Sequence, residues 1–160
     1  MTEYHLTLTE KTTTDPVFLD DILDNGEYMS LALCRGNEPY IVTLSYGYDK
    51  ENKALYCHCA KKGLKLEFIR ENNRICGTVF RDEGYIQGEC GQPYRSVVFR
   101  GTAHEITDLE DKKHAMSVLL NHLENDPSII KTTKLDQDKR YNAFSILRID
   151  IENITGKKGR

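Results

Sequence analysis

Several signals that would assign a chain to a class at once are missing from this sequence. No apolar run approaches the roughly 20 residues that a membrane-spanning helix requires. The first residues, MTEYHLTLTEKTT, have neither the basic start nor the apolar stretch of a signal peptide. We therefore expect a cytoplasmic protein that does not contact a membrane.

Charge and cysteine content exclude further classes. The net charge is −3 and no long basic run is present, so only the local cluster Lys61, Lys62 and Lys65 is reminiscent of a nucleic-acid-binding protein, and we expect none to be bound. Five cysteines, an odd number in a chain without an export signal, indicate reduced thiols rather than a disulfide framework. Neither a Walker sequence nor G-x-G-x-x-G occurs, which excludes P-loop and Rossmann nucleotide motifs.

What is present is an ordinary globular composition, 39% hydrophobic and 29% charged, in a length that suits one domain spanning residues 1–160. Runs rich in β-branched and aromatic residues and bounded by turn residues predict strands. Amphipathic runs predict helices. The predicted strands are 28–34, 39–49, 54–59, 74–80, 94–106 and 142–154, and the predicted helices are 15–26, 63–73 and one that begins near Thr107.

Three of these predicted elements contain residues that indicate local features. Alternating Leu64, Leu66 and Phe68 leave a strand possible within 63–73. Gly101 indicates a bulge or a close backbone approach in a long strand. Thr107 and Glu110 have the spacing of a capping box.

The remaining predictions concern the end of the last predicted helix, one loop and the fold class. Asp126-Pro127 is expected to end that helix, and 81–93 is a glycine-rich loop. About six mostly consecutive, hairpin-spaced strands with three helices predict a fold that is mainly β with α, an antiparallel barrel with flanking helices. The strict strand–helix alternation of a doubly wound fold is missing.

The stretch LYCHCAKKGLKLEFI, residues 55–69, allows either a metal site or an anion site. Alternation along a strand turns Cys57 and Cys59 to one face and His58 to the other, so the three side chains cannot hold one metal. The Cys-x-Cys spacing also differs from the paired Cys-x₂₋₄-Cys of structural zinc. We therefore expect no metal.

An anion fits the same stretch better. Gly63 permits close backbone approach, the start of a helix supplies oriented N–H groups, and Lys65 adds a full positive charge in the first turn. A solvated basic turn explains the residues equally well. Arg95 and Ser96, which open a strand after the glycine-rich loop, are a second pair suited to phosphate, although an edge salt bridge and a capping hydroxyl are the alternative.

Four segments in sequence resemble the FMN-binding split-barrel proteins, the pyridoxamine 5′-phosphate oxidase-like family, and most of all its 5-nitroimidazole-resistance and flavin-nucleotide-binding branch. They are PYIVTLSYGYD, LYCHCAKKGLKLEFIRENNRICGTV, YRSVVFRGTAHEITDLEDK and ILRIDIENITGKK. The resemblance extends over roughly residues 15–158. It implies a split β-barrel and a homodimer that binds two FMN molecules between its subunits.

The resemblance also implies site residues. The strand Tyr40, Ile41, Val42, Thr43 and Leu44 would run beside the isoalloxazine, His58 and Cys59 would flank the ribityl–phosphate end, Lys65 would pair with the phosphate, and Arg95 with Ser96 would complete the anion site. Leu64 stands where several relatives carry Arg, so one phosphate contact is lost. The chain has no Trp and no C-terminal segment matching the one by which true oxidases hold flavin and substrate, which argues against pyridoxamine phosphate oxidation.

The function implied is an FMN-dependent oxidoreductase that acts on a small electron acceptor such as a nitro compound. No catalytic residue can be named, and His58 is the best titratable candidate near neutral pH. A non-catalytic flavin carrier or sensor needs the same site. A split-barrel protein that binds deazaflavin or haem is the third alternative, with His58, His104 or His114 as a haem ligand.

Overall fold

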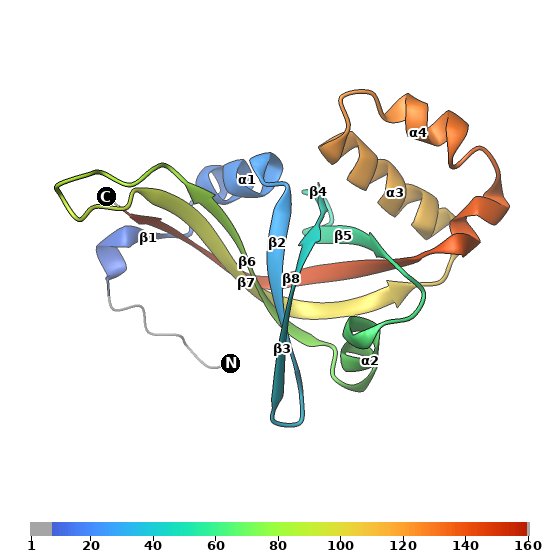
Figure 1. The fold of residues 1–160 in the computed structure, drawn as a ribbon, viewed down its shortest axis with the longest axis horizontal. Coiled ribbons are helices and arrows are strands. Elements are labelled where there is room, and N and C mark those ends of the chain that lie inside the picture. The colour runs from blue at the N-terminus through green and yellow to red at the C-terminus, as the bar shows by residue number, and fades with distance from the viewer. Residues whose placement is uncertain (1–7, 160) are drawn as a thin grey trace.

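The computed structural model describes residues 8–159, which form one antiparallel sheet with helices attached (Figure 1). The expectation that the N-terminus is not a signal peptide concerns a stretch whose first seven residues, 1–7, lie outside the described part. The strands are β1 (Thr12–Thr13), β2 (Tyr28–Arg35), β3 (Glu38–Ser45), β4 (Gly47–Asp49), β5 (Ala54–Cys59), β6 (Arg74–Asp82), β7 (Tyr94–Ile106) and β8 (Ser145–Gly159). The helices are α1 (Pro16–Asn25), α2 (Leu64–Glu71), α3 (Leu109–Leu123) and α4 (Pro127–Thr133), with 3₁₀ helices η1 (Thr9–Lys11) and η2 (Asp138–Ala143). Across residues 8–159, no helix is long and apolar enough to cross a membrane.

The strand order β3-β2-β6-β7-β8-β5-β4 confirms the predicted class, mainly β with flanking helices, in an antiparallel sheet. The sheet has eight strands rather than about six, because a short β1 pairs with β8 and the predicted strand 39–49 is two strands. β3 and β4 stand at the two ends of the order, and the chain passes from one to the other through Tyr46. The barrel is therefore left open between β3 and β4.

The interruption at Tyr46 has a packing cause. Its side chain is fully buried and its hydroxyl donates to the carbonyl of Leu23 at 2.8 Å, while its N–H donates to Glu27. Gly47 follows directly against the backbone of Leu119 in α3, where a Cβ would lie 2.7 Å from the Leu119 nitrogen. These long-range contacts turn the chain out of β3, and nothing local in the sequence announces them.

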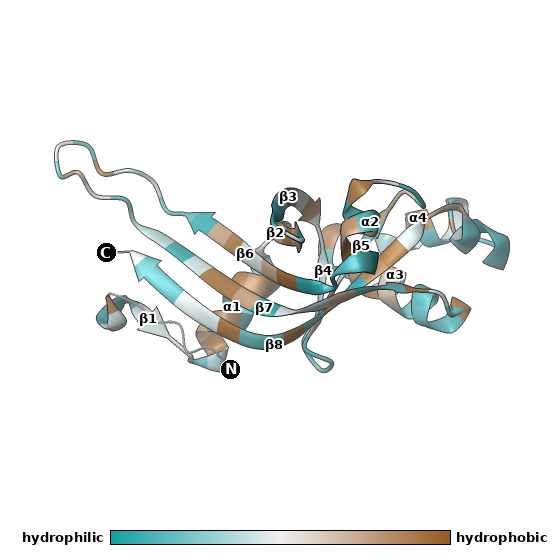
Figure 2. Ribbon diagram, turned by 90° about the horizontal axis from the view of Figure 1, so that it is seen from below, coloured by the Kyte–Doolittle hydropathy of each residue, from teal (hydrophilic) through white to brown (hydrophobic). Residues whose placement is uncertain are grey.

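The main core fills the concave side of the sheet and is closed by α1 and α2. Alternate residues of the strands point into it, so the period-two pattern of the sequence is confirmed in β2, β6 and β7. In Figure 2 the apolar part of α1 lies against β7 and β8. The largest fully buried members of this core are Tyr46, Phe68, Phe99, Ile22, Leu23, Met29, Leu31, Leu55, Leu66, Leu147 and Ile149.

A second core lies between α3 and the opposite face of β5 and β8. It contains Ala54, Tyr56, Ile106, Ala115, Met116, Leu119, Leu120, Tyr141 and Ile146. Side chains alternate along β8: Ile146 and Arg148 point toward the side of α3, while Leu147 and Ile149 point into the main core. Strands β5 and β8 are thus buried on both faces, and this fixes α3 against the barrel.

Two local predictions are confirmed by the structure. Residues 64–71 form helix α2, so the alternative strand is wrong. Gly101 marks a register shift in the pairing of β7 with β8, and a Cβ there would overlap the carbonyl oxygen of Asp150. The glycine is needed because the two backbones approach too closely for any side chain.

Two helix-terminus predictions need correction. Asp108, not Thr107, caps α3: its carboxylate accepts from the N–H groups of Glu110 at 2.9 Å and Asp111 at 3.0 Å. A carboxylate cap satisfies the same donors as a threonine and adds a favourable charge at the positive helix end. The Asp126-Pro127 pair does not end α3, which stops at Leu123; it starts α4, with Asp126 as its cap.

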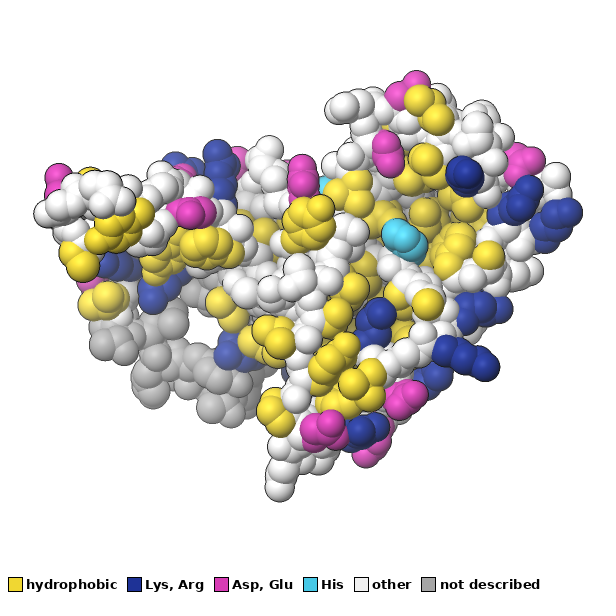
Figure 3. Space-filling view, in the orientation of Figure 1, with side chains coloured by type: hydrophobic (Ala, Val, Ile, Leu, Met, Phe, Trp, Pro, Cys, Tyr) yellow, Lys and Arg dark blue, Asp and Glu magenta, His cyan; other side chains and the backbone are white. Residues whose placement is uncertain are grey.

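On β2, β3, β6 and the first part of β7, no helix of residues 8–159 covers the face that points away from the main core, whereas α3 covers that face on β5 and β8. Side chains that point away from the main core on β2, β3, β6 and β7 include four exposed apolar ones, Tyr28, Ile41, Phe80 and Val98. We call these the outer-face residues. Figure 3 shows hydrophobic side chains gathered over the β2–β3 hairpin. Apolar groups gathered in this way on a sheet commonly mark an interaction surface.

Candidate functional site

Strand β3, which carries the predicted residues Tyr40, Ile41, Val42, Thr43 and Leu44, is an edge of the sheet. Among residues 8–159 it pairs with β2 alone, so one row of its backbone N–H and C=O groups has no strand partner in that part of the chain. Tyr40, Val42 and Leu44 pack against the main core, whereas Ile41 and Thr43 point outward. A planar ligand with a polar edge can therefore pair with this strand as a further strand would.

The end of β5 and the start of α2 bring a second group together. Cys59 points inward and is buried, whereas His58 is exposed on the other face, with its ring 6.3 Å from that of Phe144. This is the alternation expected from the sequence. Burial is the larger effect and raises the pKa of Cys57 to about 12, and it also raises the pKa of Cys59. The positive charge of Lys65 opposes this rise at both thiols. Lys65 thus lies close to the two thiols.

The N-terminus of α2 has no cap from any side chain that the structure describes. Gly63 is its N-cap residue, with φ 149°, a backbone angle that favours glycine, and none of the described side chains accepts from the first-turn N–H groups. The exposed Leu64 and the partly buried Lys65 are its first two helical residues. A helix start with free donors beside a lysine favours an anion.

The groups on β3 and α2 are neighbours in space. The ring of Tyr40 lies 5.2 Å from that of Phe68, a buried residue of α2, and the Arg35 guanidinium covers Phe68 at 4.5 Å. The structure therefore brings the predicted β3 residues close to the helix that carries Lys65. These two groups, the edge of β3 and the start of α2, are the candidate site.

Arg95 and Ser96 lie elsewhere in the same chain. They begin β7, whereas α2 meets the other end of that strand, where Arg70 binds Glu105 at 2.7 Å. At about 3.3 Å per residue, the ten steps from Arg95 to Glu105 correspond to roughly 33 Å of strand. Figure 1 shows α2 near the arrowhead of β7, far from the start of that strand.

The charge of Arg95 is already neutralised within the chain. Its Nε lies 2.9 Å from Glu83 and its Nη1 3.7 Å from Asp21. Ser96 is buried, and it faces Phe80 and Lys157 in the ladder. Within one protomer, Arg95 and Ser96 are therefore not brought to Lys65. The pairing of Arg95 with Glu83 and Asp21 could not be predicted from local sequence, because these carboxylates come from a loop and from α1.

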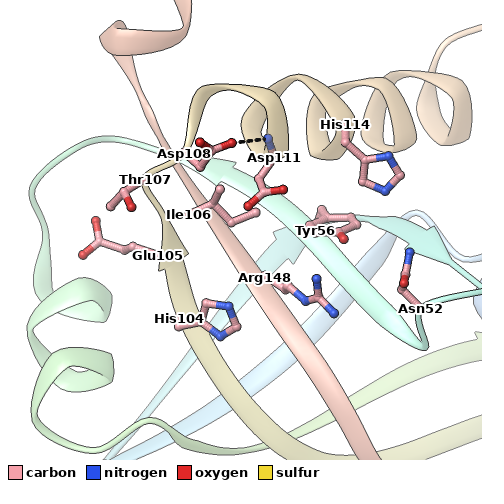
Figure 4. Close-up of a pocket in the computed structure, with 10 residues that line it drawn as sticks. All are labelled: Asn52, Tyr56, His104, Glu105, Ile106, Thr107, Asp108, Asp111, His114 and Arg148. Carbon is pink, nitrogen blue, oxygen red and sulfur yellow. Dashed lines mark hydrogen bonds between the residues drawn. The ribbon is translucent and has the colours of Figure 1, made fainter.

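A separate polar cleft of about 520 Å³ opens between α3 and the sheet (Figure 4). Its floor is a row of directly paired residues, Tyr56, Arg148 and His104, on three neighbouring strands. His114 and Asp111 from α3 form the facing wall in Figure 4. One signal for this cleft is visible in the sequence: an arginine at position 148 lies within a mostly apolar strand pattern.

The basic groups that line this cleft lie close to carboxylates of the adjoining strands β4 and β8. The Arg148 Nε donates to Asp150 at 2.7 Å, a hydrogen bond that raises the pKa of Arg148, and the other Asp150 oxygen is 3.6 Å from His104. His114 Nε2 lies 2.8 Å from the buried Asp49. His114 thus joins α3 to β4. We assign the cleft a structural role in holding α3 on the sheet.

Two further points concern metals and histidines. Within residues 8–159, no group of three or more His, Cys, Asp or Glu side chains is arranged to hold a metal ion. Of the three histidines considered for haem, His104 and His114 line the cleft, and His58 lies apart from it at the end of β5.

Comparison with known proteins now identifies the fold. The family model described as pyridoxamine 5′-phosphate oxidase matches residues 18–158. The chain belongs to the pyridoxamine 5′-phosphate oxidase family. The resemblance seen in the sequence is confirmed, and the open barrel described above is the split barrel of this family. No curated protein sequence matches the chain.

Several solved structures share the family fold. A "putative 5-nitroimidazole antibiotic resistance protein" from Bacteroides thetaiotaomicron is 22% identical, with a TM-score of 0.79 over 92% of this chain and 86% of that one. The FAD and haem binding protein of Mycobacterium smegmatis is 21% identical, with a TM-score of 0.77 over 94% and 74%. An FAD-binding protein from Mesorhizobium loti is 26% identical, with a TM-score of 0.65 over 93% and 96%.

Proposed function

We propose that this protein binds FMN and passes electrons to a small acceptor such as a nitro compound. The observation that carries the proposal is the uncapped start of α2 with Lys65, next to the free edge of β3, in a chain of this family. Structures similar to this chain include proteins that bind FAD, alone or with haem. They support a flavin; the anion site favours a phosphorylated flavin over riboflavin, and FMN in particular is what the resemblance of the sequence implies.

The residues present fit a flavin mononucleotide. The isoalloxazine has a polar edge that can pair with the free N–H and C=O groups of β3, and its apolar body suits the exposed Ile41. The 5′-phosphate suits the N–H groups at the start of α2 and the ammonium of Lys65. Leu64 cannot add a further charged contact.

A second copy of the chain is part of the proposal. Arg95 and Ser96 lie about the length of a strand away from Lys65 in one protomer, so all of them can contact one ligand only if the partner supplies the pair. Arg95 would then exchange part of its contact with Glu83 or Asp21 for the phosphate. The outer-face residues offer the apolar surface on which such a copy can pack.

When bound, the flavin supplies the electron-transfer chemistry itself. The chain binds the ring along β3, holds the phosphate at α2, and places His58 at the solvent side of β5, where it can exchange a proton with a ligand. A carrier or sensor would need the same contacts, and only turnover separates it from an enzyme.

The test is a titration of the purified protein with FMN, FAD and riboflavin, followed by absorbance and calorimetry. We expect a flavin spectrum with about one FMN per chain, tighter binding of FMN than of riboflavin, and reduction of a nitroaromatic compound when NADH or NADPH is added. Absence of any heat or spectral change with all three flavins would refute the flavin site. A haem spectrum in the purified protein would favour the haem alternative instead. FMN binding without any reduction would make the protein a carrier.

A further inference from the structure

An apolar hollow of about 380 Å³ lies between α1 and the strands β4 and β8, away from the candidate flavin site. Its walls include Leu19 and Leu23 of α1 and Ile151 and Ile154 of β8, which belong to or pack against the main core. This volume is within the range of small-molecule sites, and such sites are mostly apolar with few polar groups.

The rim of the hollow is polar, and its acidic groups are already paired. Asp20 accepts from the Tyr48 hydroxyl at 2.9 Å and binds Lys50 at 2.6 Å. Glu152 receives two hydrogen bonds from Arg74, both at 2.8 Å. The negative charges at the rim are therefore compensated by neighbouring cations.

Lys53 is different from these groups. It lines the hollow, and in residues 8–159 no ion pair joins it to an acidic side chain. Its φ is 49°, a left-handed backbone conformation that is uncommon for a residue other than glycine or asparagine. A lysine kept in a turn that favours glycine, at the mouth of an apolar hollow, suggests that its charge is used.

We propose that this hollow binds a small apolar monocarboxylate, with its hydrocarbon part among Leu19, Leu23 and Ile154 and its carboxylate on the ammonium of Lys53. The apolar lining selects the hydrocarbon, and Lys53, the one cation without an ion pair among the described rim residues, selects a single negative charge. The site is separate from the proposed flavin site and does not depend on it.

The experiment compares octanoate with 1-octanol by calorimetry, because the two share the apolar part and differ in the charged head. We expect saturable binding of one octanoate per chain, with octanol at least about tenfold weaker. Lys53→Gly should weaken octanoate about 10- to 100-fold and leave octanol unchanged. Lys53→Arg should keep most of the octanoate affinity.

Glycine suits the backbone angle of position 53, so Lys53→Gly should fold with an undiminished melting temperature. Lys134→Ala, at the end of α4, is the matched control for loss of one positive charge and should bind octanoate like the wild type. Equal affinity for octanoate and octanol, or unchanged octanoate binding by Lys53→Gly, would overturn the proposal.

Discussion

At the scale of single residues, Lys65 and Arg95 show how differently two predicted phosphate ligands are prepared. Lys65 stands at an uncapped helix start beside two buried thiols, whereas Arg95 is held by Glu83 and Asp21. The lysine can receive an anion without breaking an ion pair, and the arginine cannot. Lys65 is therefore the residue on which the phosphate contact can be tested most directly.

Replacing Lys65 by alanine should weaken FMN about 10- to 100-fold, since a charge-assisted contact contributes roughly 1.5–3 kcal/mol and each decade corresponds to about 1.4 kcal/mol. Riboflavin, which has the same ring but no phosphate, should bind as before. Calorimetric titration of both ligands measures the difference. Lys61→Ala, which removes an exposed charge from the same turn, is the control and should change FMN binding little. If Lys65→Ala retains wild-type FMN affinity, the turn is only solvated surface.

At the scale of secondary-structure elements, one buried carboxylate adds a polar contact to the apolar core between α3 and the sheet. Asp49 is almost inaccessible and accepts from the backbone and side chain of Asn52 and from His114 of α3. Burial alone would raise the pKa of Asp49, but the hydrogen bonds from Asn52 and His114 outweigh it and lower the pKa below its usual value. The ionised form is therefore the one that stabilises the fold.

Because the pKa of Asp49 is lowered in the folded protein, we expect acid to reduce the free energy of unfolding. The stabilisation by Asp49 is fully present above the pKa of the unfolded chain, near 3.8, and is lost as the pH falls through the lower folded value. Asp49→Asn should reduce the free energy of unfolding at pH 7 by about 1.5–3 kcal/mol. Urea unfolding at pH 7 and at pH 2–3 should show the gap between wild type and variant narrowing in acid.

The control for Asp49→Asn is Glu51→Gln, an exposed position in the same turn. It removes an acidic charge without touching α3, and we expect little change in stability at either pH. A variant Asp49→Asn as stable as Glu51→Gln at pH 7 would contradict the role of Asp49 as the anchor of α3.

The elements also show which features the sequence could reveal. The alternation of β5, β6, β7 and β8 and the bulge at Gly101 follow from local patterns, and all are found. The break at Tyr46 depends on Leu23 and Leu119, which are distant in the chain. Asp108 and Thr107 are adjacent candidate caps, so local sequence could not choose between them. The cleft around Arg148 depends on strand order, which no periodicity encodes.

At the scale of the whole molecule, the site residues and the exposed surface lead to the same proposal. Lys65 and Arg95 lie at opposite ends of β7, and the outer-face residues leave apolar surface in contact with solvent. A homodimer would solve both problems, because it would cover the apolar face and bring the two ends together from different chains.

The outer face provides the test of this assembly. Phe80 is 58% exposed, so Phe80→Glu should leave the fold of one protomer intact while placing a charge in the proposed interface. We expect the wild type to sediment as a dimer and the variant to raise the dimer dissociation constant at least about tenfold, as expected when a buried aromatic contact is lost. Ile129→Glu is the matched control: Ile129 is similarly exposed, at 57%, but lies on α4, so that variant should remain dimeric.

Because the proposed FMN site needs Arg95 of the partner, dilution of Phe80→Glu should release FMN as the dimer dissociates. A wild type that sediments as a monomer and still holds FMN tightly would show that one chain forms the whole site, and Arg95 and Ser96 would then have no part in it.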